Sequence, residues 1–286
     1  MNADALLFHM LKGGVGKRAR DEIGACIAKK LQRARPYLFE DERAAVDDLR
    51  QRGYATFPPI FTAEQIQNIH RYFSDKPATY YDDNPNKPRQ PPARFAEWSQ
   101  EIISACPEFA QAAHDPRLLR IAEAYLECPP LVTILTAWWS YPSAAPLGGM
   151  QYFHHDRDDF RCLKLFAYLT DVTEDTGPHQ YVDGTHDSAT ITHPLDTDEF
   201  WEWMDKSHRK SEADVAGWFG KPRTITGPAG STFLEDTRGI HRGVPPISGP
   251  RMVFEICYAM RAKSNTDYKP IPWGITCEAT RLFYAA

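Results

Sequence analysis

The sequence lacks a long hydrophobic run, closely spaced cysteines and an excess of positive charge. No apolar run reaches the roughly eighteen residues that a membrane-spanning helix needs, so no membrane association is predicted. The six cysteines lie far apart without a Cys-x-x-Cys pair, which favours reduced, mostly buried thiols in a cytoplasmic protein. Lysine and arginine number 33 against 38 aspartates and glutamates, and the net charge of −5 argues against a nucleic-acid partner.

A complete phosphate-binding loop is also missing, although residues 12–17 read KGGVGK. Such a loop needs a Ser or Thr after its lysine to hold Mg²⁺, and here Lys17 is followed by Arg18. No β-branched strand precedes the glycines, and the chain shows no strand–helix alternation of the kind that a parallel sheet requires. We therefore interpret this stretch as a helix broken by glycines, and the sequence does not favour a nucleotide-driven ATPase.

Helix signals are concentrated in the N-terminal half. Residues 1–49 are rich in Lys, Arg, Glu and Ala, and they predict a helical N-terminal extension. Thr62 can cap a helix over residues 62–73, and Gln65 completes its capping box. Asp115 precedes a proline at the first position of another predicted helix, residues 116–127.

Strand signals dominate the C-terminal half, and they predict an antiparallel β-core within a single domain spanning residues 1–286. β-branched and aromatic runs bounded by Gly and Pro predict strands at 53–61, 131–141, 161–172, 230–237 and 251–260. The proline-rich residues 75–96 are predicted to form a long loop. Residues 188–228 form a charged, tryptophan-containing insertion of helical character, at a place where a lid would be expected.

The stretch QYFHHDRDD, residues 151–159, carries the candidate metal chemistry. On an extended strand His154 and Asp156 point to the same face, so both can bind one cation. His241 follows a later strand and can supply a third ligand. Two histidines and one carboxylate on one face of a metal are typical of non-haem Fe(II) oxygenases. A β-bulge could turn His155 inward in place of His154, although strand parity with Asp156 favours His154.

Arg251 begins the next predicted strand, and its guanidinium can make two parallel hydrogen bonds to a distal carboxylate. With this arginine the order His-x-Asp, His, Arg resembles the phytanoyl-CoA dioxygenase family of Fe(II)/2-oxoglutarate-dependent oxygenases. The matching segments are residues 151–188 and 230–256, and residues 50–69 look like the opening of the family's domain.

The resemblance implies an α+β protein with a mainly β core, a double-stranded β-helix or jelly-roll with helices packed on one sheet. It places this core at residues 50–263, with 188–228 as an insertion and 264–286 as a C-terminal tail. It also implies Fe(II) as cofactor, bound by the His154, Asp156 and His241 side chains, and 2-oxoglutarate and O₂ as cosubstrates.

In the family's pattern Arg251 anchors the C5 carboxylate of 2-oxoglutarate. The family often has a Ser or Thr two residues after the last histidine to assist this arginine, whereas here that position is Gly243. We expect another donor to help, either Thr232 or Lys164. Lys164 shares one strand face with Phe166 and Tyr168, where its ammonium could reach a carboxylate of cosubstrate or substrate, or could extend to solvent.

Further candidates concern the cavity wall. Gln151 could hydrogen-bond cosubstrate or substrate, or lie on a loop surface. Trp138 and Trp201, like Phe166 and Tyr168, are candidate substrate contacts, with core packing as the alternative for Trp138 and a satellite helix for Trp201. His179 and Tyr181 could point into the cavity or have a hydrogen-bonded core role.

These observations predict an oxygenase that hydroxylates a small-molecule metabolite and releases succinate and CO₂. Asp156 favours hydroxylation over halogenation, because related halogenases leave that ligand position to chloride, and desaturation or cyclisation stays open. The alternative is a catalytically inactive jelly-roll protein that binds a metal or small molecule. The sequence does not indicate the substrate or the oligomeric state.

Overall fold

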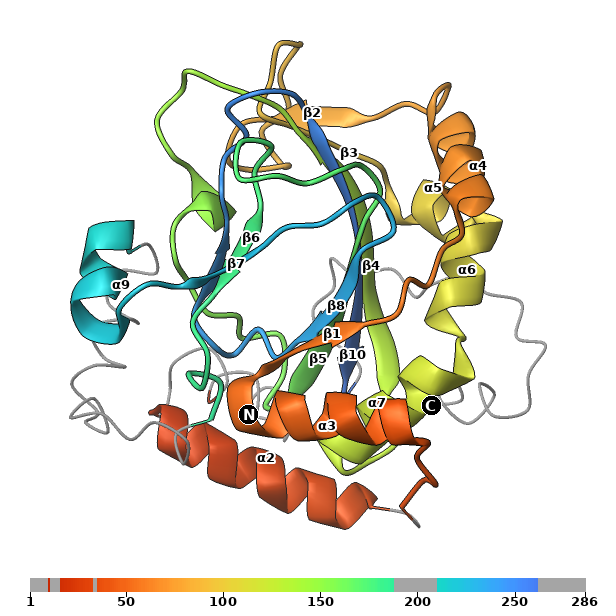
Figure 1. The fold of residues 1–286 in the computed structure, drawn as a ribbon, viewed down its shortest axis with the longest axis vertical. Coiled ribbons are helices and arrows are strands. Elements are labelled where there is room, and N and C mark those ends of the chain that lie inside the picture. The colour runs from red at the N-terminus through yellow and green to blue at the C-terminus, as the bar shows by residue number, and fades with distance from the viewer. Residues whose placement is uncertain (1–9, 11–15, 33–34, 188–209, 262–286) are drawn as a thin grey trace.

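The structure is a computed structural model that describes residue 10 and residues 16–32, 35–187 and 210–261 (Figure 1). Its helices are α2 (Lys17–Leu31), α3 (Glu40–Arg52), α4 (Ala63–Phe73), α5 (Gln100–Ser104), α6 (Pro107–Ala113), α7 (Pro116–Leu126) and α9 (Glu212–Phe219), with a 3₁₀ turn, η2 (Gly149–Gln151). None of these helices is long and apolar enough to cross a membrane.

Two antiparallel sheets form the core. The larger one has seven strands in the order β1-β8-β5-β10-β4-β3-β2, and the smaller one has three in the order β7-β6-β9. The strands are β1 (Tyr54–Phe57), β2 (Thr79–Tyr81), β3 (Phe95–Glu97), β4 (Leu131–Ser140), β5 (Cys162–Tyr168), β6 (His179–Tyr181), β7 (Arg223–Ile225), β8 (Thr232–Glu235), β9 (His241–Gly243) and β10 (Arg251–Ala259). The predicted mainly-β jelly-roll fold with helices on one sheet is thereby confirmed.

Strand β5 shows how the large sheet separates two environments. Leu163, Leu165 and Ala167 belong to the core cluster shared with the helices, whereas Phe166 and Tyr168 belong to a second cluster between the sheets. Successive side chains of a strand point to opposite faces, so one face packs against the helices and the other faces the space between the two sheets. Because both faces are covered, β5 and β10 read as nearly continuous apolar runs, with the few polar residues on the inner face.

Helices α3 to α7 cover the outer face of the large sheet, whereas α9 lies apart from them (Figure 1). The α6 residue Phe109 stacks on Phe254 of β10 with ring centroids 3.9 Å apart and an interplanar angle of 8°. The predicted caps are present, because Thr62 accepts from the backbone N–H of Gln65 and Asp115 accepts from that of Arg117.

The segment predicted as a long loop, residues 75–96, instead contains β2 and the start of β3. Both strands have three residues. β3 extends the sheet by pairing Phe95 with Ser140 of β4, and β2 pairs with β3 and forms the edge. So short a strand carries little periodicity of its own, and its pairing with β4 is not visible in the local sequence.

The N-terminal extension forms α2 and α3. Lys17, the lysine of the glycine-rich stretch, begins α2, and its side chain is 3 % exposed. Its Nζ donates to the carbonyl of His186 at 2.6 Å and lies 3.5 Å from Asp21 Oδ1. The ammonium is thus engaged inside the protein, while residues 11–15 lie outside the described part of the chain.

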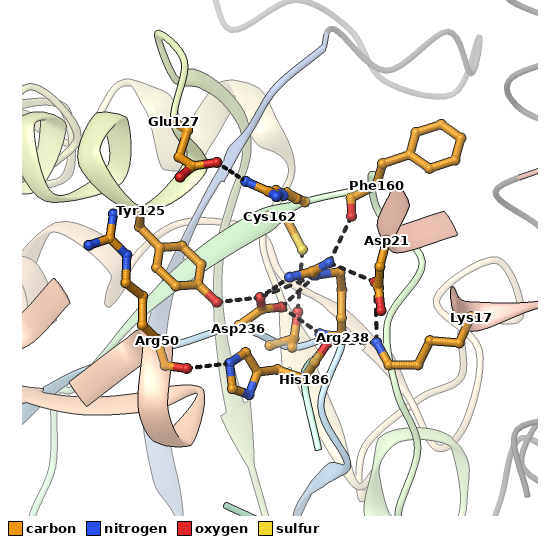
Figure 2. Close-up of polar contacts among 12 residues, drawn as sticks. Lys17, Asp21, Arg50, Tyr125, Glu127, Phe160, Cys162, His186, Asp236 and Arg238 are labelled. Carbon is orange, nitrogen blue, oxygen red and sulfur yellow. Dashed lines mark hydrogen bonds and ion pairs between the residues drawn. The ribbon is translucent and has the colours of Figure 1, made fainter. Parts of the chain in front are cut away.

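A buried polar network fastens α2 and α7 to the turn between β8 and β9 (Figure 2). The Arg238 Nη2 donates to Asp236 Oδ2 at 2.6 Å, and its Nη1 donates to Asp21 Oδ1 of α2 at 3.1 Å. The Tyr125 hydroxyl of α7 donates to the same Asp236 oxygen at 2.6 Å. Burial raises the pKa of Asp236, but Arg238 outweighs it and lowers that pKa to about 2. The turn that leads to His241 is therefore held by charge-assisted contacts.

Replacing Arg238 with Met should lower the free energy of unfolding by about 3–5 kcal/mol, because it leaves the buried Asp236 carboxylate without its charge partner. The matched control is Arg223→Met, which removes the partly exposed pair with Asp183 and should cost about 1 kcal/mol or less. Urea denaturation followed by circular dichroism measures both. Equal losses in the two variants would show that the network contributes no more than a surface ion pair.

Candidate metal and cosubstrate site

His154 and His241 are brought together by the backbone. The N–H of each residue donates to the carbonyl of the other, at 3.0 and 2.9 Å, and the imidazole centroids are 4.3 Å apart. Asp156 is placed by a 2.7 Å bond from its backbone N–H to the Thr237 carbonyl. One ligand atom from each of the three residues lies within 4.8 Å of the others. The sequence-distant residues predicted as a triad therefore converge.

Hydrogen bonds to backbone carbonyls orient both imidazoles. Nδ1 of His154 lies 2.8 Å from the Tyr152 carbonyl, and Nδ1 of His241 lies 2.9 Å from the Gly239 carbonyl. A carbonyl can only accept, so each Nδ1 carries the proton and each Nε2 keeps its lone pair for a metal. Burial lowers the pKa of His241 to about 4, so its ring is neutral near pH 7. Two imidazoles and a carboxylate suit a divalent transition metal such as Fe(II).

Lys164 holds the third candidate ligand. Its Nζ donates to Asp156 Oδ2 at 2.8 Å and lies 3.0 Å from both Asp158 Oδ2 and Glu255 Oε1. Burial raises the pKa of Asp156, but the Lys164 ammonium outweighs it and holds that pKa well below its usual range. The sequence suggested that Lys164 reaches a carboxylate of cosubstrate or substrate. The structure instead places its ammonium among three carboxylates of the protein.

A cavity of about 330 Å³ opens beside the triad, between the two sheets. Trp138, Phe166 and Tyr168, the described residues among the predicted substrate contacts, all line it. Gln151 also lines it, and its Oε1 accepts from the Gly148 N–H at 3.2 Å. Trp201 lies outside the described residues, so its predicted role has no structural counterpart here.

Arg251 reaches this cavity from the start of β10 and is 5 % exposed. Its Nη1 donates to the Gly177 carbonyl and its Nη2 lies 3.3 Å from Ser140 Oγ, while its Nε has no hydrogen-bond partner in the part of the chain that the structure describes. Among the described residues no carboxylate forms an ion pair with it. A buried guanidinium without a counter-ion is costly, and a carboxylate entering the cavity would compensate it. The site therefore fits 2-oxoglutarate at this end.

The donor beside Arg251 differs from the two expected. Thr232 of β8 directs its hydroxyl to the Gly230 carbonyl at 2.9 Å and is not among the residues that line the cavity, whereas its neighbour Phe233 is. Ser140 takes the place beside the guanidinium because β4 pairs with β10 in the register Arg251 to Ser140. That register joins strands far apart in the chain, so the local sequence held no signal for Ser140.

A buried pair missed by the sequence analysis lies next to His241. His179 lines the cavity, and its Nε2 is 2.9 Å from Oε2 of the fully buried Glu235, which in turn lies 3.8 Å from His241 Nδ1. Burial raises the pKa of Glu235 to about 8, while burial and then Arg251 lower the pKa of His179 well below its usual range. The sequence analysis left His179 open between cavity and core, and it did not consider Glu235.

The chain matches a known protein family. The phytanoyl-CoA dioxygenase (PhyH) family matches residues 49–245, and the chain belongs to this family. The class to which the chain belongs is therefore that of Fe(II)- and 2-oxoglutarate-dependent oxygenases, with O₂ as the second cosubstrate. No curated protein sequence matches the chain.

Solved structures share the fold at low sequence identity. The α-ketoglutarate-dependent epimerase SnoN from nogalamycin biosynthesis is 15 % identical, with a TM-score of 0.56 over 82 % of this chain and 87 % of that one. HygX from Streptomyces hygroscopicus, solved with nickel and 2-oxoglutarate bound, is 16 % identical, with a TM-score of 0.56 over 79 % and 89 %. The carbocyclase SnoK, also from nogalamycin biosynthesis, is 17 % identical, with a TM-score of 0.54 over 78 % and 87 %.

Alanine substitutions at His154 and His155 separate the two neighbouring histidines. His154→Ala should weaken Fe(II) or Co(II) binding more than about 100-fold, since even outer residues of a metal site typically contribute 10–100-fold. His155→Ala should leave the affinity within a few fold, because His155 is not among the three converging residues. Calorimetric titration under anaerobic conditions measures both. A larger loss in His155→Ala would assign the ligand to His155.

Proposed function

We propose that the protein hydroxylates a small-molecule metabolite, using Fe(II) bound by His154, Asp156 and His241 and consuming 2-oxoglutarate and O₂ to release succinate and CO₂. The observation that carries this proposal is the convergence of the three side chains beside a buried arginine that has no carboxylate partner among the described residues. A protein that only bound a small molecule would have no need of that arginine in the cavity beside a metal site. We place this activity in a core at residues 50–263, with residues 1–49 as an extension.

Each residue has a separate task in this mechanism. The Nε2 atoms of His154 and His241, with Asp156, would hold the ferrous ion, and Lys164 keeps the second Asp156 oxygen in place. Iron, when bound, supplies the activation of O₂ that couples decarboxylation of 2-oxoglutarate to oxidation of the substrate. Arg251 binds the distal carboxylate of the cosubstrate, which fixes the keto-acid end toward the metal.

The cavity walls support a compact, partly polar substrate. Phe95 and Trp138 offer apolar faces, and Gln151 and Glu255 offer hydrogen-bonding groups beside them. Aromatic walls also limit water around the reacting atoms. HygX has been solved with hygromycin B and SnoN with nogalamycin RO, so the fold accommodates natural products. We infer a metabolite of natural-product or glycan biosynthesis as the substrate.

Hydroxylation is the outcome we favour, because the retained Asp156 occupies the position that a halide would need. The fold also supports other outcomes, since SnoN is described as an epimerase and SnoK as a carbocyclase. Product analysis by mass spectrometry distinguishes them, because hydroxylation adds one oxygen atom whereas epimerisation leaves the mass unchanged and ring closure by desaturation removes two hydrogens.

Anaerobic addition of Fe(II) and 2-oxoglutarate to the pure protein should produce a visible charge-transfer band, and admitting O₂ should then release succinate. Arg251→Met should weaken 2-oxoglutarate binding about 10- to 100-fold, as expected for loss of hydrogen bonds to a charged group, while metal affinity is unchanged. Absorption spectroscopy and calorimetry measure these effects. Folded, metal-loaded protein that shows neither the band nor succinate would be a binding protein and not an oxygenase.

A further inference from the structure

One side of the Arg251 guanidinium faces a position without a side chain. Gly243 lies on β9, and a Cβ built there would be 3.3 Å from Arg251 Nη2. A hydroxyl at this position would therefore touch the guanidinium and any carboxylate bound to it. Because the chain has glycine here, that donor must come from another strand.

His179 is the direct neighbour of this position. Strands β6 and β9 are antiparallel, and their register pairs His179 with Gly243 and Tyr181 with His241. Opposed residues of an antiparallel pair project to the same face, so the imidazole occupies the side of the sheet that Gly243 leaves open. The ring lies near-parallel to His241, at 5.6 Å between centroids and an angle of 12°. It thus lines the same cavity as His241 and Arg251.

The polar atoms of this histidine and its partner are incompletely satisfied. His179 is 8 % exposed and Glu235 is fully buried, yet within the described chain His179 Nε2 and both Glu235 oxygens lack a hydrogen bond of good geometry. Phe166 and Phe233 enclose the ring at centroid distances of 5.0 and 5.5 Å. Buried polar groups of this kind are retained when they serve a ligand or a catalytic role. Arg251, whose Nε also has no hydrogen-bond partner among the described residues, lines the same cavity.

We propose that His179, oriented by Glu235, is a second binding residue for the distal carboxylate of 2-oxoglutarate, in place of a hydroxyl at position 243. This inference rests on the proposed function. It assigns to a β6 histidine the task that we had expected of Thr232 or Lys164. Ser140 and His179 then flank Arg251 from opposite sheets, so the carboxylate is held from both walls of the jelly-roll.

The test compares wild type with His179→Phe and His179→Leu, two apolar replacements of different shape. Titrated anaerobically in their Co(II)-loaded forms, both variants should bind 2-oxoglutarate about 10- to 100-fold more weakly, as expected for a lost hydrogen bond to a charged group. Pyruvate, which has no distal carboxylate, should bind wild type and variants alike. His70→Leu is the matched control, since His70 bonds the Leu169 carbonyl on the helix side of the sheet.

A second substitution tests the alternative that His179 has only a structural role. Adding Gly243→Ser to either apolar variant should recover most of the lost 2-oxoglutarate affinity, because the hydroxyl then contacts the same carboxylate. The inference is overturned if the apolar variants bind 2-oxoglutarate as wild type does, or if they lose pyruvate and 2-oxoglutarate equally. Failure of wild type itself to bind 2-oxoglutarate would instead overturn the proposed function.

Discussion

The candidate active site depends on one antiparallel backbone contact, the pair of hydrogen bonds between His154 and His241. Residues paired in this way project their side chains to the same face of the sheet. The contact therefore places the imidazoles of two distant segments side by side. The carbonyls of Tyr152 and Gly239 then select the nitrogen that each ring presents. Little is left to side-chain freedom, which is what a metal site with a demanding geometry requires.

The two buried cationic side chains that line the cavity, Lys164 and Arg251, differ in their partners. Lys164 contacts three carboxylates and has no charge to spare for a ligand, whereas Arg251 contacts a carbonyl and a hydroxyl and forms no ion pair within the described chain. Removing an ion from water costs several kcal/mol or more unless a counter-charge repays it, on the order of the penalties known for buried pairs. The lysine therefore stabilises the apoprotein locally, and the arginine is left to be stabilised by an anionic ligand. This contrast distinguishes a structural cation from a binding one.

Whether a feature of the fold or site can be predicted from the sequence depends on how far apart along the chain its interacting residues lie. The spacing of His154 and Asp156, the strand signals and the helix caps are local, and the structure agrees with them. Ser140 and Glu235 were missed because their places follow from registers between strands that are remote in the chain. Thr232 and Phe233 are successive strand residues and therefore point to opposite faces of the sheet. The sequence alone does not show which of these faces lines the cavity.

The same reasoning extends to residues outside the family match. Helix α2 precedes the matched range, yet its Asp21 binds Arg238, which holds Asp236 in the turn before His241. Thr237 of that turn also accepts the backbone N–H of Asp156. Two of the three candidate metal ligands therefore depend on a turn that an N-terminal helix helps to hold. The extension is better understood as part of the support of the site than as an appendage to a complete oxygenase core.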